Sequence, residues 1–161
     1  MGPLSGLKVH DFSRLLPGPL CTHLLVRLGA SVVKIEAPSQ DYARDIPPLI
    51  RSYKCISNRL SEYLQLISAL FAFNRFDKNT EHGAFYEALN GDKKNIMVDL
   101  KDTEQRQIIR KLARTYDVVV EGNRPGVMDR LGLGYEDLKK ENPGLIYCSL
   151  SGYGATGPLA Q

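Results

Sequence analysis

The chain has 161 residues, 43% of them hydrophobic and 24% charged, which is the composition of an ordinary soluble globular domain. It contains no run of about 18 apolar residues, so no membrane-spanning helix is predicted, and a net charge of +3 is too small to indicate a nucleic-acid partner. Three separated cysteines, Cys21, Cys55 and Cys148, form neither a disulfide framework nor a zinc cluster. We therefore expect a reducing, intracellular setting: the cytoplasm or, in a eukaryote, a mitochondrion or peroxisome.

The amino-terminal part predicts a strand, a helix and a second strand. Residues 7–12 alternate as a β-strand, and Pro19 suits the first turn of a helix because its missing N–H is not needed there. An apolar stripe at helical spacing follows, formed by Cys21, Leu24, Leu25 and Leu28. Gly29 ends the helix, and residues 31–35 form an apolar run typical of a strand buried on both faces.

The same alternation returns in the second half of the chain. The predicted strands lie at residues 95–98, 117–121 and 145–150, and the predicted helices at about 103–115 and 135–141. Thr103 is the expected N-cap of the first of these helices. Such an order predicts an α/β fold with a doubly wound, Rossmann-like parallel sheet and helices on both faces. We expect the sheet to be incomplete at its carboxyl-terminal side.

Residues 49–81 interrupt this order, as an insertion into a single domain that spans residues 1–161. Within the insertion, a helix is predicted over about residues 60–73, with an apolar face that includes Leu64 and Ile67. We expect this helix to pack on the sheet or on a partner subunit. A membrane-surface helix would carry basic residues on its own polar face, whereas those of the insertion lie mostly outside it.

A nicotinamide dinucleotide site is one interpretation of the first strand–helix–strand unit, because Glu36 ends its second strand. The turn after the first strand, however, reads RLLPGP instead of G-x-G-x-x-G. Its prolines do not allow the close backbone approach that a pyrophosphate needs. No P-loop, H-E-x-x-H or nucleophile-elbow motif is present either.

The loops that follow the later strands carry more information, since open parallel sheets bind ligands at the carboxyl ends of their strands. Residues 121–134 contain five glycines or prolines together with Arg124 and Arg130, and residues 151–158 are also rich in glycine. Arginines offer charged forks to phosphates, and glycines leave backbone N–H groups accessible. Taken alone, such loops are as compatible with structural turns as with a ligand site.

Five blocks of sequence occur together and in order: residues 4–9, 17–19, 28–36, 120–126 and 151–154. This set resembles the class III CoA-transferase family, which includes formyl-CoA:oxalate transferases and 2-methylacyl-CoA racemases. The resemblance implies an enzyme that moves CoA between carboxylic acids, or a racemase that exchanges the α-proton of an acyl-CoA. It also implies acyl-CoA as the substrate, no metal and a homodimer.

The resemblance further implies which residues bind CoA. The expected ligand contacts, in chain order, are Leu15 and Leu16 near the adenine; Leu89, Asn90, Gly91, Asp92 and Lys93 along the nucleotide; Val98, Asp99, Leu100 and Lys101 toward the substrate; Gly122, Asn123, Arg124 and Arg130 on pantetheine and phosphates; and Ser151, Gly152, Tyr153 and Gly154 near the thioester. Ala37 departs from the family pattern, because many relatives place an arginine there against a phosphate.

The family's catalytic residue lies beyond the segment that matches residues 157–161: an aspartate in transferases, and a histidine with an aspartate in racemases. We therefore expect this chain to be the amino-terminal, CoA-binding part of such an enzyme and to be inactive alone. The alternative is a non-catalytic CoA-binding or interaction module that retains the fold. Whether the gene continues past Gln161 into Gly-Tyr-Asp or Gly-His-Asp would separate these hypotheses.

Overall fold

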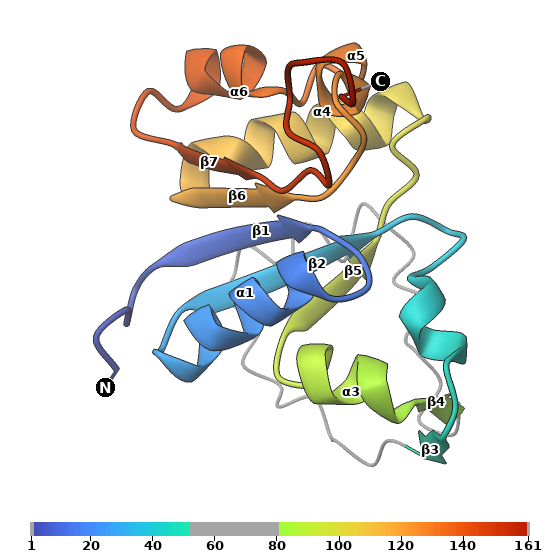
Figure 1. The fold of residues 1–161 in the computed structure, drawn as a ribbon. Coiled ribbons are helices and arrows are strands. Elements are labelled where there is room, and N and C mark those ends of the chain that lie inside the picture. Colours follow the sequence, from blue (N-terminus) through green and yellow to red (C-terminus); the bar gives the residue numbers. More distant parts are fainter. Residues whose placement is uncertain (1, 52–80, 161) are drawn as a thin grey trace.

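A computed structural model of the protein describes residues 2–51 and 81–160. Its centre is a parallel sheet of five strands in the order β5-β2-β1-β6-β7 (Figure 1). The strands are β1 (Lys8–Phe12), β2 (Ser31–Glu36), β5 (Lys94–Met97), β6 (Val118–Glu121) and β7 (Ile146–Ser149). The predicted α/β fold with a parallel sheet is therefore confirmed. The helix predicted at residues 60–73 and Cys55 lie outside the described residues.

Helices cover both faces of the sheet (Figure 1). One face carries α1 (Pro17–Arg27) and α3 (Ala84–Asn90), and the other carries α4 (Thr103–Leu112), α5 (Val127–Arg130) and α6 (Tyr135–Glu141). The smaller elements are the 3-10 turns η1 (Tyr42–Asp45) and η2 (Ala113–Thr115) and an antiparallel pair, β3 (Leu49–Arg51) with β4 (Glu81–Gly83). Within the described residues, no helix is both long and apolar enough to cross a membrane.

Two apolar cores form because successive side chains of a strand point to opposite faces. In β2, Val33 and Ile35 join the core under α4 and α6, together with Ile109 and Leu138. On the other face, Val32 packs with residues of β1 and β6 beside α1. The inner strands β2 and β6 are thus buried from both sides, as their near-continuous apolar runs predict, whereas the outer strands β5 and β7 are partly exposed.

The chain reverses its winding direction at β1, which lies between β2 and β6. Residue Asp11 of β1 is level with Lys34 on one side and with Val120 on the other. All five strands run parallel, so their carboxyl ends meet at one edge of the sheet. In open α/β sheets, the crevice at such a switch point is where ligands bind.

Helix α1 differs from its prediction in two respects. It begins at Pro17, two residues before the expected first residue. Its inner side is formed by small residues, Gly18, Pro19 and Thr22, whereas leucines of the predicted stripe point away from the sheet. The exposed leucines are Leu16, Leu20, Leu24 and Leu28, at 40–54%. Its end is as predicted: Gly29 adopts a left-handed backbone with φ of 105°.

Helix α4 is capped by Asp102 and not by Thr103, so that prediction is wrong. Asp102 has an extended backbone, and its carboxylate accepts hydrogen bonds from the N–H groups of Glu104 at 2.8 Å and Gln105 at 3.2 Å. Thr103 is already the first helical residue. An aspartate caps a helix as well as a threonine does, and a carboxylate also suits the positive end of the helix dipole.

This assignment predicts different outcomes for two neighbouring substitutions. Asp102→Ala removes the acceptor for two N–H groups and should lower the free energy of unfolding by about 1 kcal/mol. Thr103→Ala, the matched control, should change it by less than about 0.5 kcal/mol. Urea unfolding followed by circular dichroism measures both. Equal effects, or a larger effect of Thr103→Ala, would contradict the cap.

Candidate functional site

Most of the residues expected to bind CoA lie at the carboxyl edge of the sheet. Leu15 and Leu16 follow β1, residues 98–101 follow β5, residues 122–124 follow β6, and residues 151–154 follow β7. Residues 89–93 do not share this position, because they end α3 and precede β5. The structure thus gathers four of the five predicted segments at one edge.

The loops after β1, β6 and β7 touch one another at the switch point. A side-chain carbon placed on Gly122 would lie 3.7 Å from Cβ of Ser13 and 3.8 Å from the carbonyl oxygen of Leu150. Gly18 comes closer still, because a Cβ there would overlap the Ser13 side chain. A glycine at residue 18 therefore lets the start of α1 pack against the β1 loop.

Glu121 joins the ends of β6 and β7. Its buried carboxylate accepts from the Asn123 N–H at 2.7 Å and from Asn123 Nδ2 at 3.2 Å. The Ser149 hydroxyl of β7 donates to the other carboxylate oxygen. These bonds hold Asn123, one of the predicted ligand contacts, at the mouth of the crevice.

Three arginines at this edge carry exposed positive charge: Arg14 after β1, Arg124 after β6 and Arg130 at the end of α5. None of them forms an ion pair with residues 2–51 or 81–160. Arg14 is not among the contacts predicted from the sequence. Its position directly after the first strand could have indicated it, because open α/β sheets bind ligands at the carboxyl ends of their strands. The edge can therefore attract phosphate groups.

The amino terminus of α1 contributes little to such binding. Pro17 and Pro19 lack an N–H, and the N–H of Leu20 is already bonded to the carbonyl of Leu16. Only Gly18 has a backbone donor in the first turn, whereas a dinucleotide loop presents several. The first turn of α1 therefore lacks the set of backbone donors that a dinucleotide loop presents.

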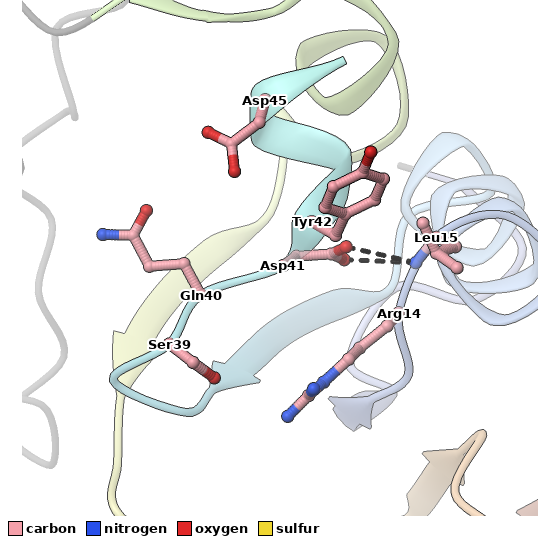
Figure 2. Close-up of a pocket in the computed structure, with 7 residues that line it drawn as sticks. All are labelled: Arg14, Leu15, Ser39, Gln40, Asp41, Tyr42 and Asp45. Carbon is pink, nitrogen blue, oxygen red and sulfur yellow. Dashed lines mark hydrogen bonds between the residues drawn. The ribbon is translucent and has the colours of Figure 1, made fainter.

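A pocket of about 370 Å³ opens between the loops after β1 and β2 (Figure 2). Its lining consists of Arg14, Leu15, Ser39, Gln40, Asp41, Tyr42 and Asp45. Leu15 and Tyr42 expose apolar and aromatic surface, and the remaining side chains offer polar groups. This size and this mixture suit part of a small organic ligand.

Beneath the carboxyl edge, on the face covered by α1 and α3, the core is charged. Asp11 pairs with Lys93 at 3.1 Å, Lys34 pairs with Asp41 at 3.1 Å, and Glu36 pairs with Arg44 at 2.9 Å. All six side chains are at most 5% exposed. Three carboxylates and three cations leave this core with no net charge.

Comparison with known proteins decides the family. The family model for CoA-transferase family III matches residues 4–161. The chain belongs to CoA-transferase family III. It is 38% identical to the acetyl-CoA:oxalate CoA-transferase of Acetobacter aceti, a match that covers 99% of this chain and 34% of that protein. It is 37% identical to the human succinyl-CoA:glutarate CoA-transferase, covering 99% of this chain and 30% of that protein.

The fold agrees with solved structures of the same group. A CAIB/BAIF family protein from Brucella suis superimposes with a TM-score of 0.80 at 36% identity, over 99% of this chain and 36% of that one. The resemblance to class III CoA-transferases is therefore confirmed. This family III chain spans about a third of the length of the relatives it matches.

Within this family III chain, the segment 89–93 contacts the first turn of α1 and the end of β1. Leu89 and Asn90 are buried, and Lys93 Nζ donates to the Pro19 carbonyl at 2.8 Å as well as to Asp11. Desolvation lowers the pKa of Lys93 to about 8, although the Asp11 carboxylate acts to raise it. The contact of this segment with a nucleotide stays a prediction.

Metal ligands are not grouped in the part of the chain that the structure describes: no three His, Cys, Asp or Glu side chains lie together there. Cys21 and Cys148 are free thiols. The carboxylate of Asp11, which is fully buried, is already bonded to Ser13, Thr22 and Lys93.

Two buried groups titrate far from their ordinary values. Burial alone would raise the pKa of Glu36, but hydrogen bonds and charge from Arg44, with further bonds from Tyr86 and Asn95, lower it to about 2. His10 packs against the ring of Tyr116, and burial lowers its pKa to about 3. Both groups therefore bind protons more weakly in the folded chain than in the unfolded one.

This difference predicts acid sensitivity with a defined sign. A Glu36 pKa lowered from 4.5 to about 2 contributes about 3 kcal/mol of stability that is complete above pH 4.5 and lost as the pH falls toward 2. His10 adds a loss that begins near pH 6.5. Glu36→Gln should cost about 3–5 kcal/mol at pH 7, because it leaves Arg44 buried without its carboxylate.

The measurement is urea unfolding at a series of pH values. The gap in unfolding free energy between wild type and Glu36→Gln should narrow as the pH falls below 4.5. Glu104→Gln, a change to an exposed carboxylate of α4, is the control and should give a small, nearly constant gap. A Glu36→Gln gap that stays constant from pH 7 to pH 3 would show that Glu36 is not held ionised by its partners.

Proposed function

We propose that this chain is the CoA-binding part of an acyl-CoA transferase that moves CoA between carboxylic acids. The observation that carries the proposal is the gathering of the predicted CoA contacts at the switch point of a family III fold. The relatives named above are transferases for acetyl-CoA with oxalate and for succinyl-CoA with glutarate. Because the chain covers only about a third of such proteins, we propose binding for the chain itself and transfer for the protein as a whole.

The chemistry of the edge suits this ligand. CoA carries a pyrophosphate and a 3′-phosphate, and Arg14, Arg124 and Arg130 offer charged forks without an ion pair among the described residues. The exposed glycines of the loop after β7, Gly152 and Gly154, leave room beside the crevice. A ligand that is long, anionic at one end and flexible at the other fits an edge built in this way.

A binding experiment tests the proposal. Titration calorimetry should detect CoA binding to the wild-type chain, with an affinity that falls as salt is raised. Arg124→Ala or Arg130→Ala should each cost about 1.5–3 kcal/mol of binding free energy, the value of a charge-assisted hydrogen bond. No transfer activity above a control without protein is expected from the 161 residues alone.

The matched control is Arg27→Ala, which removes an exposed arginine from the last turn of α1, away from the carboxyl edge. This variant should bind CoA like the wild type. A folded wild-type chain without measurable affinity for CoA would refute the proposal. Equal losses of CoA affinity in the Arg27→Ala, Arg124→Ala and Arg130→Ala variants would show that CoA is held only by nonspecific charge attraction.

Self-association is a second part of the proposal, and helix α1 supports it. Leu24 and Leu28 are 54% and 45% exposed, and Leu16 and Leu20 extend the same stripe at intervals of four residues. A helix that is apolar on its inner and outer sides is normally covered on both. We propose that a second copy of the protein covers the outer side.

This part predicts the behaviour of a surface variant. Leu24→Glu combined with Leu28→Glu should convert a self-associating chain into a monomer with an unchanged circular dichroism spectrum. Leu159→Glu, which changes another exposed leucine, should leave association unaltered. Light scattering over micromolar to millimolar concentrations measures the mass. A wild-type chain that stays monomeric throughout would contradict a dimer through α1.

A further inference from the structure

The loop after β1 is held from the inside by buried charged side chains. The Asp11 carboxylate accepts from the Ser13 N–H at 2.9 Å, and Lys34 Nζ donates to the Ser13 carbonyl at 2.8 Å. Two residues further on, the Leu15 N–H donates to both carboxylate oxygens of Asp41 at 3.3 Å (Figure 2). The backbone on both sides of residue 14 is therefore anchored to buried charges.

Leu15 needs such an anchor. Its φ of 61° lies in the left-handed region, which a glycine enters freely and a leucine does not. Asp41 can hold it because Asp41 is itself fixed: it pairs with Lys34 at 3.1 Å, both side chains are fully buried, and it accepts from the Ala43 N–H at 3.0 Å. In dinucleotide-binding folds, glycines allow the backbone to make such a turn. Here the buried Lys34–Asp41 pair stabilises the left-handed backbone of Leu15 instead.

Arg14 is the residue whose placement depends on these anchors. It lies between Ser13 and Leu15, is exposed, and lines the pocket in Figure 2. It is the pocket's one cation among the described lining residues. Two carboxylates also line the pocket. Asp41 forms an ion pair with Lys34, whereas Asp45 is exposed to solvent.

We propose that Asp41 is a positioning residue for phosphate binding: through the Leu15 N–H it holds Arg14 at the pocket, where Arg14 binds a phosphate of CoA. The inference rests on the proposed function, since CoA is the ligand. It goes beyond it by assigning a role to Arg14 and to the buried Lys34–Asp41 pair. Asp41 itself does not touch the ligand phosphate, because two like charges would repel.

The test is a double-mutant cycle on CoA affinity, measured by titration calorimetry. Arg14→Ala should weaken binding about tenfold in the wild-type background, as expected for one lost charge-assisted contact. In an Asp41→Ala background, where Arg14 has lost its position, Arg14→Ala should weaken binding less than threefold further. Such non-additivity is the sign of residues that act as one unit.

A loss of stability alone would not produce this coupling. Leu138→Ala is the matched control, because it creates a cavity in the core under α4 and α6, on the other face of the sheet. This change destabilises the fold but leaves the β1 loop intact. In the Leu138→Ala background, Arg14→Ala should therefore still weaken CoA binding about tenfold. If Asp41→Ala does not fold, the double change Lys34→Met with Asp41→Leu replaces it, because it removes the acceptor for the Leu15 N–H without leaving an unpaired buried charge. Its background should reduce the effect of Arg14→Ala in the same way.

The outcomes separate the two proposals. A folded wild type that does not bind CoA removes the proposed function and, with it, the ligand of Arg14. If the wild type binds CoA but Arg14→Ala has no effect, the present inference alone is wrong. It is also wrong if Arg14→Ala costs the same tenfold in the wild type as in the Asp41→Ala background or in the Lys34→Met, Asp41→Leu background that replaces it.

Discussion

Burial of charge under the carboxyl edge of the sheet is the constraint on which much of this structure depends. Each buried ion pair joins two segments of the chain: β1 with the turn before β5, β2 with the loop before η1, and β2 with η1 itself. A buried charge without its partner costs several kcal/mol, so each of these segments is stable only when its partner segment is packed against it. The loop after β1 takes its shape from the same pairs, because Lys34 and Asp41 bond directly to its backbone.

The neutral core also separates two electrostatic roles. On the face covered by α1 and α3, three buried anions and three buried cations cancel, so this core has no net charge. Outside, Arg14, Arg124 and Arg130 are exposed and form no ion pair with the described residues. In the proposed function these arginines attract a polyanion such as CoA. The buried pairs fix the position of the loop after β1, which carries Arg14. In open α/β sheets, ligand-binding residues usually lie on loops, and the rigid sheet beneath positions those loops.

Helix α1 links the candidate site to the proposed dimer surface. Its inner side is made of Gly18, Pro19 and Thr22, small residues that let it approach the sheet, and Thr22 adds a bond to the buried Asp11. Its outer side carries the leucine stripe. A partner packed on that stripe would lie next to the loop that carries Arg14, so association and ligand binding would meet at one helix.

The sequence alone determined the five strands of the parallel sheet, helices α1, α4 and α6, the glycine that ends α1 and, through five blocks in order, the family. These follow from local patterns: apolar runs, turn residues and motifs that are continuous in the chain. The sequence did not indicate the short elements α3, α5, β3 and β4. It did not determine which side of α1 faces the sheet, that Asp102 caps α4, or that Arg14 and Asp41 belong to one arrangement. The sequence indicated no role for Lys34, and for Lys93 it predicted only a contact with the nucleotide. Only the tertiary structure paired them with carboxylates up to 82 residues away, because the energy of a buried charge depends on what surrounds it in space and not on its neighbours along the chain.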